Sequence, residues 1–234
     1  MITKSIHIVS FDVPFPPNYG GVIDVYYKCK ALKQLGVEIH LHCFQYGREE
    51  SQRLLKHCET VTYYKRKKFV NPLGSYIPYI VKSRINKELI RNLAKNDFPI
   101  LLEGLHCTWP LISKGIDNSR IYVRTHNIEH EYYKRLESVE QKPFKRLYFK
   151  IESKKLLGYE KVLSKAMGIV AISHFDKKHF KETNENTIWA SAFHESEVIE
   201  SKVGKGHFAL YHGNLSVGEN DHAAKYLAAE VFSK

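Results

Sequence analysis

Phe11-Asp-Val-Pro-Phe-Pro-Pro-Asn-Tyr-Gly-Gly-Val22 is a Pro-rich bend that ends in two glycines, and this stretch decides the fold of the chain. The residues before it, Ser5 to Phe11, are predicted to form a buried strand. After it, apolar residues recur at helical spacing and stop at Gly36; they are Val22, Val25, Cys29, Leu32 and Leu35. Val37 to Phe44 then predicts a second strand. A strand, a helix and a strand in so short a span form a right-handed parallel crossover.

In such a crossover the ligand crevice lies at the carboxyl ends of the strands, which places Gly20 and Gly21 beneath it. Glycines allow a phosphate or a sugar to approach the backbone, and the start of a helix favours negative charge. The spacing differs from the dinucleotide pattern G-x-G-x-x-G. A tight turn between strand and helix, without any ligand, explains the same two glycines equally well.

Strand and helix alternate along most of the chain, and this predicts a doubly wound α/β fold with a parallel, Rossmann-like sheet. Further strands are expected at 60–64, 99–102, 120–124 and 168–172, and helices at 49–57, 80–94 and 144–164. Ser173 and Asp176 have the spacing of a capping box, which predicts the start of another helix.

The polar stretch from Ser196 to Gly206 predicts a break between two domains. After it, a strand at 208–212, a glycine turn and a helix at 219–232 repeat the opening pattern. We therefore expect an N-terminal domain at 1–197, a linker at 198–206 and, at 207–234, the first strand and helix of a second α/β domain. One strand and one helix cannot bury a core of their own.

The charge of the chain predicts an anionic partner, because 36 Lys and Arg residues against 25 Asp and Glu residues give a formal net charge of +11. The cations gather at 65–68 and along 142–155. Nucleic acid, an anionic membrane face and phosphorylated small molecules all fit this charge. Tyr63, Tyr64 and Phe69 flank the first cluster, where they suit base stacking, membrane anchoring or a plain solvated loop.

The sequence has no apolar run of the roughly 20 residues that a membrane span needs, and its start lacks a signal-peptide pattern. We therefore expect a cytoplasmic protein. The four cysteines have no C-x-x-C pairing and lie mostly inside apolar segments; they are Cys29, Cys43, Cys58 and Cys107. This usage predicts buried, reduced thiols without disulfides.

Four short motifs follow one another along the chain at the ends of predicted strands. They are Pro16-Pro-Asn-Tyr-Gly-Gly21, Glu103-Gly-Leu-His106, Arg124-Thr-His-Asn127 and Tyr211-His-Gly-Asn-Leu-Ser216. In content and order they resemble the N-terminal half of a GT-B glycosyltransferase, specifically the family-four retaining enzymes that build bacterial polysaccharides and glycolipids. In this resemblance, residues 1–197 correspond to the acceptor-side domain, and 207–234 to the start of the nucleotide-sugar domain.

The resemblance implies a hexosyltransferase that moves a sugar from a nucleotide-sugar donor to a saccharide or lipid-linked acceptor. It also implies retention of configuration, and neither a metal nor another cofactor. The family's E-x7-E element, which grips the donor late in the second domain, is not expected before Lys234. We therefore expect this chain alone to be inactive or nearly so. Its basic charge suits peripheral attachment to the inner face of the membrane.

The same resemblance implies the residues of the site. His126 is the expected catalytic contact to the transferred sugar or the acceptor hydroxyl, since an imidazole can donate or accept a hydrogen bond near neutral pH. The substrate-binding candidates are Gly20, Gly21, Glu103, His106, Arg124 and Asn127, and the donor-binding candidates are Gly213, Asn214 and Ser216. Arg124 suits a phosphate. His106 fits a structural histidine equally well, and Asn127 and Glu129 also suit the cap of the following helix.

Two other functions remain open on the sequence. His126-Asn-Ile-Glu-His130 fits the H-x-x-E-H motif of zinc metalloproteases. That motif needs both histidines inside one helix, yet the predicted strand ends just before His126, so we expect no metal there. The other alternative is a non-enzymatic module that binds nucleic acid or a membrane through its basic segments. Nucleic acid is not the partner we expect, because no common nucleic-acid-binding motif is visible.

Overall fold

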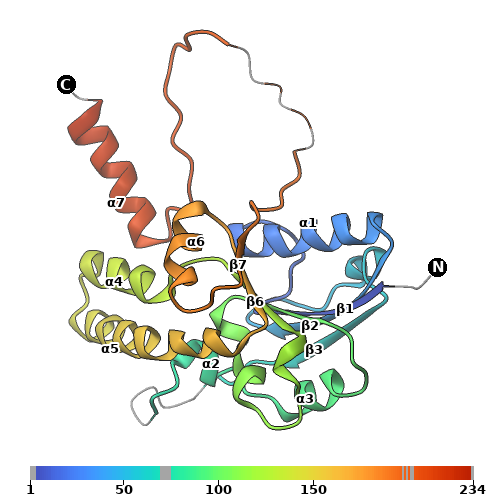
Figure 1. The fold of residues 1–234 in the computed structure, drawn as a ribbon. Helices are drawn as coiled ribbons and strands as arrows, with labels where there is room; N and C mark the ends of the chain where they lie inside the picture. The colour runs from blue at the N-terminus through green and yellow to red at the C-terminus, as the bar shows by residue number, and fades with distance from the viewer. Residues whose placement is uncertain (1–3, 69–74, 197, 199, 201–202, 233–234) are drawn as a thin grey trace. The chain divides into compact units, whose positions relative to one another are not determined.

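The computed structural model describes residues 4–68, 75–196, 198, 200 and 203–232. Its centre is a seven-stranded sheet in the order β3-β2-β1-β4-β5-β6-β7, in which every neighbouring pair is parallel. The chain runs from β1 to one edge of the sheet, returns to β4 and continues to the other edge (Figure 1). The predicted doubly wound, Rossmann-like α/β fold is confirmed. Its strand order places a topological switch point between β1 and β4.

The predicted crossover forms β1 (Lys4–Ser10), α1 (Gly20–Gln34) and β2 (Val37–Gln45). Gly36, at a φ of 76°, allows the tight turn from α1 into β2, because a positive φ suits glycine. The face of α1 that carries Val22, Val25 and Cys29 is buried, as the spacing predicted. Leu35, predicted on the same face, is 78% exposed because it caps α1 beyond the last helical residue.

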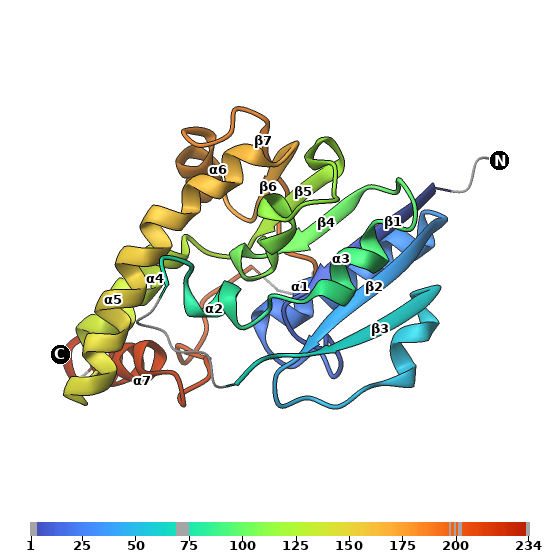
Figure 2. The same cartoon turned by 90° about the horizontal axis from the view of Figure 1, so that it is seen from below.

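Helices cover both faces of the sheet, with α1 on one face and α3 (Lys87–Leu93) on the other (Figures 1 and 2). The sequence predicted one helix at 80–94, but the chain forms α2 (Tyr79–Lys82) and then α3 as a separate helix. Asn86 explains the break. Its side chain accepts hydrogen bonds from the N–H groups of Glu88 and Leu89 at 2.8 and 3.1 Å, which begins a new helix.

The remaining strands are β3 (Thr60–Lys65), β4 (Ile100–Glu103), β5 (Ile121–Thr125), β6 (Gly168–Ala171) and β7 (Thr187–Trp189). The first four confirm the predictions to within a residue or two. β7 was not predicted, because three residues are too few to show alternation. α6 (His174–Lys181) begins as the capping box predicted, with the N–H of Asp176 donating to Oγ of Ser173 at 3.0 Å.

Several connections are short 3-10 helices: η1 (Gln52–Lys56), η2 (Leu105–Cys107), η3 (Trp109–Ile112), η4 (Asn118–Arg120) and η5 (Glu160–Lys165). η1 replaces the helix predicted at 49–57. On one side of the sheet the core is formed mainly by Ile8, Val13, Val25, Ile39, Leu41 and Leu54. All four cysteines are free and buried, as predicted.

A directional chain of hydrogen bonds crosses β3, β2 and β1. Asn92 Nδ2 donates to the hydroxyl of Tyr64 at 2.8 Å, and this hydroxyl lies 2.9 Å from Nδ1 of His42. Nε2 of His42 lies 2.9 Å from Nδ1 of His7, whose Nε2 lies 2.9 Å from Oδ1 of Asn96. Every donor in this order meets an acceptor only when both imidazoles are neutral.

The chain divides into two compact units, residues 1–128 with 155–195, and residues 129–154 with 196–234. The helices of the second unit are α4 (Glu129–Val139), most of α5 (Pro143–Tyr159), α7 (Gly218–Tyr226) and a π-helix, η6 (Leu227–Val231). The helix predicted at 144–164 thus ends at Tyr159, and η5 follows it. The domain division at 197 and 207 remains a prediction.

The strand predicted at 208–212 does not form. The described part of the second unit holds no other strand for it to pair with, and an isolated strand leaves its backbone groups without partners. Among the described helices, none combines the length and the apolar character that crossing a bilayer requires.

Candidate functional site

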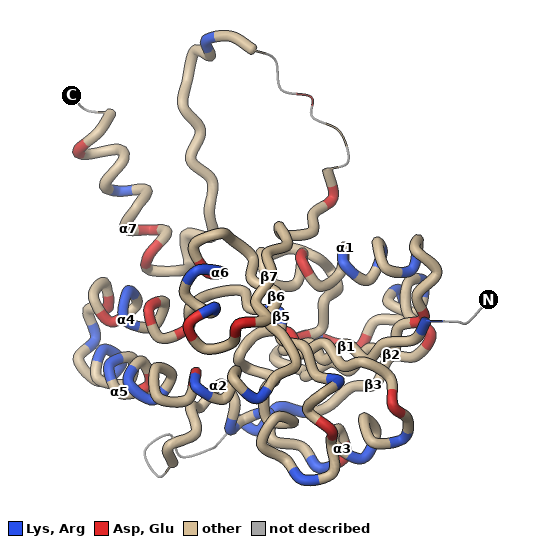
Figure 3. Tube along the Cα trace, in the orientation of Figure 1, with Lys and Arg blue, Asp and Glu red and all other residues tan. Residues whose placement is uncertain are grey.

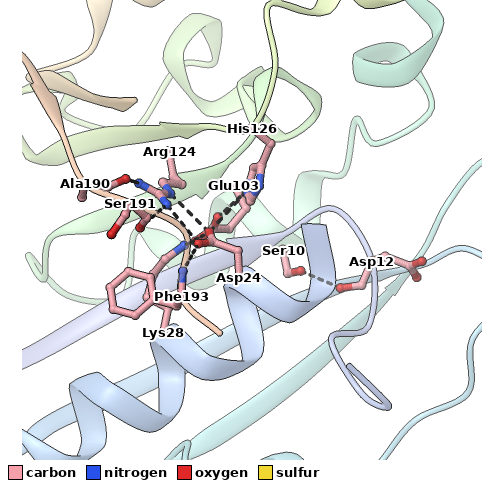
Figure 4. A network of polar contacts seen from close by, with 10 residues as sticks. All are labelled: Ser10, Asp12, Asp24, Lys28, Glu103, Arg124, His126, Ala190, Ser191 and Phe193. Atoms are coloured by element: carbon pink, nitrogen blue, oxygen red, sulfur yellow. Dashed lines mark hydrogen bonds and ion pairs between the residues drawn. The ribbon is translucent and has the colours of Figure 1, made fainter. Parts of the chain in front are cut away.

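Charged side chains gather at the carboxyl ends of the central strands, the edge at which open parallel sheets bind ligands. Glu103 is the last residue of β4, Arg124 lies near the end of β5, and His126 follows that strand. Asp24 and Lys28 join them from the buried face of α1. Figure 4 shows these side chains pointing toward one another. We call the five residues the charge cluster.

His126 is held by Glu103. Its Nε2 lies 2.8 Å from Oε2 of Glu103, whose side chain has no exposed surface. Burial alone would raise the pKa of Glu103, but the ammonium group of Lys28 and the hydrogen bond from His126 lower it. Glu103 is thus an ionised acceptor, and Nε2 carries the proton that it donates. In neutral His126 this leaves Nδ1 as an acceptor, and no group in the described part of the chain bonds to it.

Asp24 is the centre of the charge cluster. Its Oδ2 lies 2.9 Å from Nζ of Lys28 and 3.2 Å from Nε of Arg124, and its Oδ1 lies 2.9 Å from Nη2 of Arg124. Lys28 also reaches Glu103, with 2.6 Å between Nζ and Oε1. Burial would raise the pKa of Asp24, yet Lys28 and the hydrogen bond from Arg124 hold it well below its usual range. Each buried charge in the cluster therefore has an opposite partner.

Three side chains of the charge cluster lie close enough together to bind one metal ion. One oxygen each of Asp24 and Glu103 and one nitrogen of His126 lie within 4.8 Å of one another. Lys28, however, contacts both carboxylates and so occupies the place that a cation would take between them. Two carboxylates and two permanent cations already balance. The donor set fits a buried ion-pair network better than a metal centre.

The chain that follows β7 lies against the charge cluster. Nη1 and Nη2 of Arg124 donate to the carbonyl oxygens of Ala190 and Ser191 at 2.6 and 3.0 Å, and the N–H of Phe193 donates to Oδ1 of Asp24 at 2.9 Å (Figure 4). All three nitrogens of the guanidinium are thus engaged. A phosphate, the ligand predicted for Arg124, would have to displace these contacts.

The two glycines of the first loop have different surroundings. A Cβ on Gly21 would lie 2.6 Å from Cζ of Phe11, whereas a Cβ on Gly20 would have nothing within 4 Å. The ring of Phe11 meets the ring of His126 edge-on, with 5.4 Å between their centroids. Gly21 is therefore required for packing of Phe11, and Gly20 leaves open space at the start of α1.

His106 is not part of the charge cluster but packs on Phe11, with 5.3 Å between ring centroids. Burial, and then the guanidinium of Arg84, lower the pKa of His106 well below its usual value. Gly104, at a φ of 70°, makes room for it, since a Cβ there would lie 2.9 Å from Nδ1 of His106. These contacts favour the structural alternative for His106. Asn127 is exposed in the turn after β5.

A cleft of about 610 Å³ opens at the carboxyl ends of β1 and β2. Residues from the two following loops line it: Asp12, Phe15, Pro16, Asn18, Tyr19, Tyr46, Gly47, Arg48, Glu49, Glu50 and Ser51. The hydroxyl of Tyr19 donates to Oδ2 of buried Asp12 at 2.9 Å. Arg48 lies over the ring of Tyr19 and donates to Oδ1 of Asn18 at 3.0 Å. Aromatic rings combined with a few fixed polar groups are typical of small-molecule sites.

The predicted donor contacts lie in the turn before α7, in the second unit. Oδ1 of Asn214 accepts hydrogen bonds from the N–H and the hydroxyl of Ser216 at 3.1 and 2.6 Å. Gly213 precedes them, with the hydroxyl of Tyr211 3.3 Å from the position that its Cβ would take. The role of these residues toward a donor remains a prediction.

Sequence reasoning did not find Asp24, Lys28 or the residues of the cleft after β2. A signal for the first two was present, because Asp24 and Lys28 lie one helical turn apart on the face of α1 that carries Val25 and Cys29. Charged residues on a core face are rarely buried unless they are paired. Such a pair on the core face of a helix predicts a buried ion pair.

The two alternatives lose support from local geometry. β5 ends at Thr125 and α4 begins at Glu129, so His126 precedes the helix, as predicted, and the zinc motif lacks its helical spacing. Beside the cations at 65–68, Tyr64 is buried in the chain of hydrogen bonds and Tyr63 donates to the carbonyl of Ser51 at 3.1 Å. The buried ring of Tyr64 therefore presents no free stacking platform. Phe69 lies outside the described residues.

No known protein-family model matches the sequence. It is 29% identical over 151 residues to an uncharacterized 44.6 kDa protein in the cps region of Klebsiella pneumoniae, a match that covers 62% of this chain and 39% of that protein. The fold is similar to a UDP-glucosyltransferase from Polygonum tinctorium capable of glucosylating indoxyl, with a TM-score of 0.52, 10% identity, and coverage of 88% of this chain and 56% of that one. A structure of LpCGTa in complex with UDP matches with a TM-score of 0.49 and 10% identity over 84% of this chain and 55% of that one. The chain thus spans little more than half the length of the solved structures it matches. Over that span its Rossmann-like fold is similar to that of the UDP-glucosyltransferase, a protein of GT-B fold.

Proposed function

We propose that this chain is the acceptor-side part of a glycosyltransferase that moves a hexose from a nucleotide-sugar donor to a saccharide or lipid-linked acceptor. The fold supports the class of reaction. The relative in a cps region supports a place in bacterial polysaccharide or glycolipid synthesis. The four free, buried cysteines suit the reducing cytoplasm, where we place the reaction.

The observation that carries the proposal is the pairing of His126 with Glu103. Glu103 fixes which nitrogen of the imidazole bears the proton, and the residues that the structure describes leave Nδ1 without a hydrogen-bond partner at the ligand-binding edge of the sheet. In the proposed complex, Nδ1 accepts a hydrogen bond from a hydroxyl of the transferred sugar or of the acceptor. Lys28 lowers the pKa of Glu103 and so keeps it ionised, while Asp24 holds both Lys28 and Arg124 in place.

The remaining site residues have proposed roles of different kinds. Gly20 admits the donor diphosphate or the acceptor to the open start of α1, where unbonded N–H groups favour negative charge. Gly213, Asn214 and Ser216 contact the donor phosphates. The acceptor binds in the cleft lined by Tyr19, Tyr46 and Arg48, where aromatic rings can contact the face of a sugar.

We further propose that transfer proceeds with retention and without a bound metal, as the family-four resemblance implies. In that case His126 orients a hydroxyl and does not act as the base of a direct displacement. Inversion would instead assign His126 and Glu103 the role of a general base and the carboxylate that orients it.

The proposal is tested with the protein in the form that its source organism makes. It is incubated with a panel of nucleotide sugars labelled in the sugar, together with lipid and saccharide extracts of that organism, with and without a chelator. Labelled product and released nucleotide are expected from one donor, with no effect of the chelator. NMR of the product gives the configuration of the new bond. No transfer with any donor contradicts the proposal.

A further inference from the structure

The outer surface of α5 has an unusual composition. The helix contains one acidic residue, Glu152, and that residue is fully buried. Its exposed side chains between 143 and 154 are therefore all cationic or apolar: Pro143, Phe144, Lys145, Arg146, Leu147, Lys150 and Lys154. The cations follow one another along α5 in Figure 3. Of these cations, Lys145 is paired with Glu140 at 2.7 Å, whereas no carboxylate in the described part of the chain pairs with Arg146, Lys150 or Lys154.

The apolar residues on this surface are large and well exposed. Phe144 is 88% exposed and Leu147 is 54% exposed. At 3.6 residues per turn, Phe144, Leu147 and Lys154 share one face of α5. The opposite face is covered within the second unit by α4, where Tyr133 contacts Phe149 and the carbonyl of His130 accepts a hydrogen bond from Ser153 at 2.9 Å. The exposed face is thus free for a partner that is both anionic and apolar.

We propose that the exposed face of α5 binds the surface of an anionic lipid bilayer. The helix lies along the membrane, its cations near the lipid phosphates, and Phe144 and Leu147 enter the boundary of the acyl chains. Charge complementarity identifies the partner, because the face carries unpaired cations without a single exposed acid. Phe144 and Leu147 favour a bilayer over nucleic acid as the partner, because nucleic acid offers negative charge but no apolar layer into which Leu147 could insert. This inference stands independently of the transfer reaction.

Vesicle binding of the full-length protein tests the proposal. Vesicles of phosphatidylcholine alone are compared by sedimentation with vesicles that contain an equal share of phosphatidylglycerol, each at low and high salt. Binding is expected only to the anionic vesicles, weaker at high salt. The double variant F144S/L147S and the triple variant R146Q/K150Q/K154Q each lower the affinity by about tenfold or more, since charge and insertion both contribute.

Matched variants elsewhere on the surface serve as controls. F175S/L35S removes an exposed Phe and an exposed Leu, and K33Q/K87Q/K178Q removes three exposed cations, all from other helices or their ends. Both controls are expected to bind as the wild type does. Thermal melting confirms that each variant folds.

Four results would overturn the proposal. Equal binding to neutral and anionic vesicles, or no binding at all, removes the lipid partner. If the control variants bind as weakly as the α5 variants, the total charge of the protein or nonspecific hydrophobic contact explains vesicle binding, and the exposed face of α5 does not. Binding of a DNA oligonucleotide that depends on Arg146, Lys150 and Lys154, without dependence of vesicle binding on Phe144 and Leu147, assigns the face to nucleic acid.

Discussion

Nε2 of His126 lies 2.8 Å from Oε2 of Glu103, and this contact joins two strand ends that are 23 residues apart in the sequence. Parallel neighbours bring them together, since Glu103 and Arg124 pair in the register of β4 and β5. The same carboxyl group contacts Lys28, so one buried charge orients the proposed catalytic imidazole and neutralises a lysine.

Glu103→Gln tests the role of this contact. The amide keeps the shape but loses the charge that fixes the proton on Nε2, so kcat is expected to fall by about 10- to 100-fold with little change in the donor KM. Initial rates of transfer measure both constants. The exposed variant Glu59→Gln is the control. An unchanged kcat in a folded Glu103→Gln protein would mean that the contact does not serve the reaction.

The Asp24–Lys28 pair has an exposed counterpart, because Asp221 and Lys225 form an ion pair of the same spacing on α7. Lys28→Met leaves two buried carboxylates without their shared cation and is expected to lower the free energy of unfolding by about 3–5 kcal/mol. Lys225→Met removes a pair on the surface and is expected to change it by about 0.5 kcal/mol or less. Denaturant unfolding monitored by circular dichroism compares them. Equal losses of unfolding free energy in Lys28→Met and Lys225→Met would contradict the claim that burial makes the Asp24–Lys28 pair important for stability.

Gly20 and Gly21 are expected to respond differently to the same substitution. Gly21→Ala forces the ring of Phe11 to move and should destabilise the fold by about 1–3 kcal/mol. Gly20→Ala meets open space, and alanine favours a helix, so stability should stay within about 1 kcal/mol of the wild type or rise. The melting temperatures of the two variants, compared with that of the wild type, measure this difference in stability. A destabilised Gly20→Ala protein together with a stable Gly21→Ala protein would contradict the geometry of this loop.

The hydrogen-bonded histidines predict a loss of stability in mild acid. Burial, and then His7 and His40, lower the pKa of His42 from 6.5 to about 3, and burial also lowers the pKa of His7. Unfolding restores the ordinary pKa values, so the unfolded state binds more protons below pH 6.5 and stability falls as the pH falls. His42 alone contributes a slope approaching about 1.4 kcal/mol per pH unit until the pH nears its folded pKa.

The buried carboxylates affect a different pH range. The pKa values of Asp24 and Glu103 lie below their usual values of 3.8 and 4.5, so their contribution is lost only in stronger acid. Unfolding free energies measured between about pH 6.5 and 5 therefore report on the histidines. His42→Gln is expected to flatten the slope in this range. A slope that is the same in wild type and variant would contradict neutral histidines in the folded protein.

The fold was largely predictable because β1 and β2 are buried, apolar and joined by one amphipathic helix. Parallel pairing then placed the ends of β4 and β5 at one edge, so Glu103, Arg124 and His126 could be grouped from the sequence. The contacts within the group could not. The sequence shows Lys28 and Asp24 as a charged pair on the core face of a helix, but only the packing of α1 on the sheet shows that Lys28 contacts Glu103.

Other differences come from local interactions that a pattern does not reveal. β7 has three residues and owes its place to pairing with β6. Asn86 divides a predicted helix because its side chain competes for backbone N–H groups. The segment at 208–212 has the composition of a strand, but a strand forms only where a neighbour completes its hydrogen bonds.

The most direct test of the account is transfer by His126→Ala, compared with His174→Ala, which changes an exposed histidine of α6. Both variants are made in the form of the protein that its source organism produces and assayed with the donor that supports transfer. The account predicts a folded His126→Ala protein with transfer abolished, beside full activity of His174→Ala. Wild-type turnover by His126→Ala would contradict the proposed role of His126.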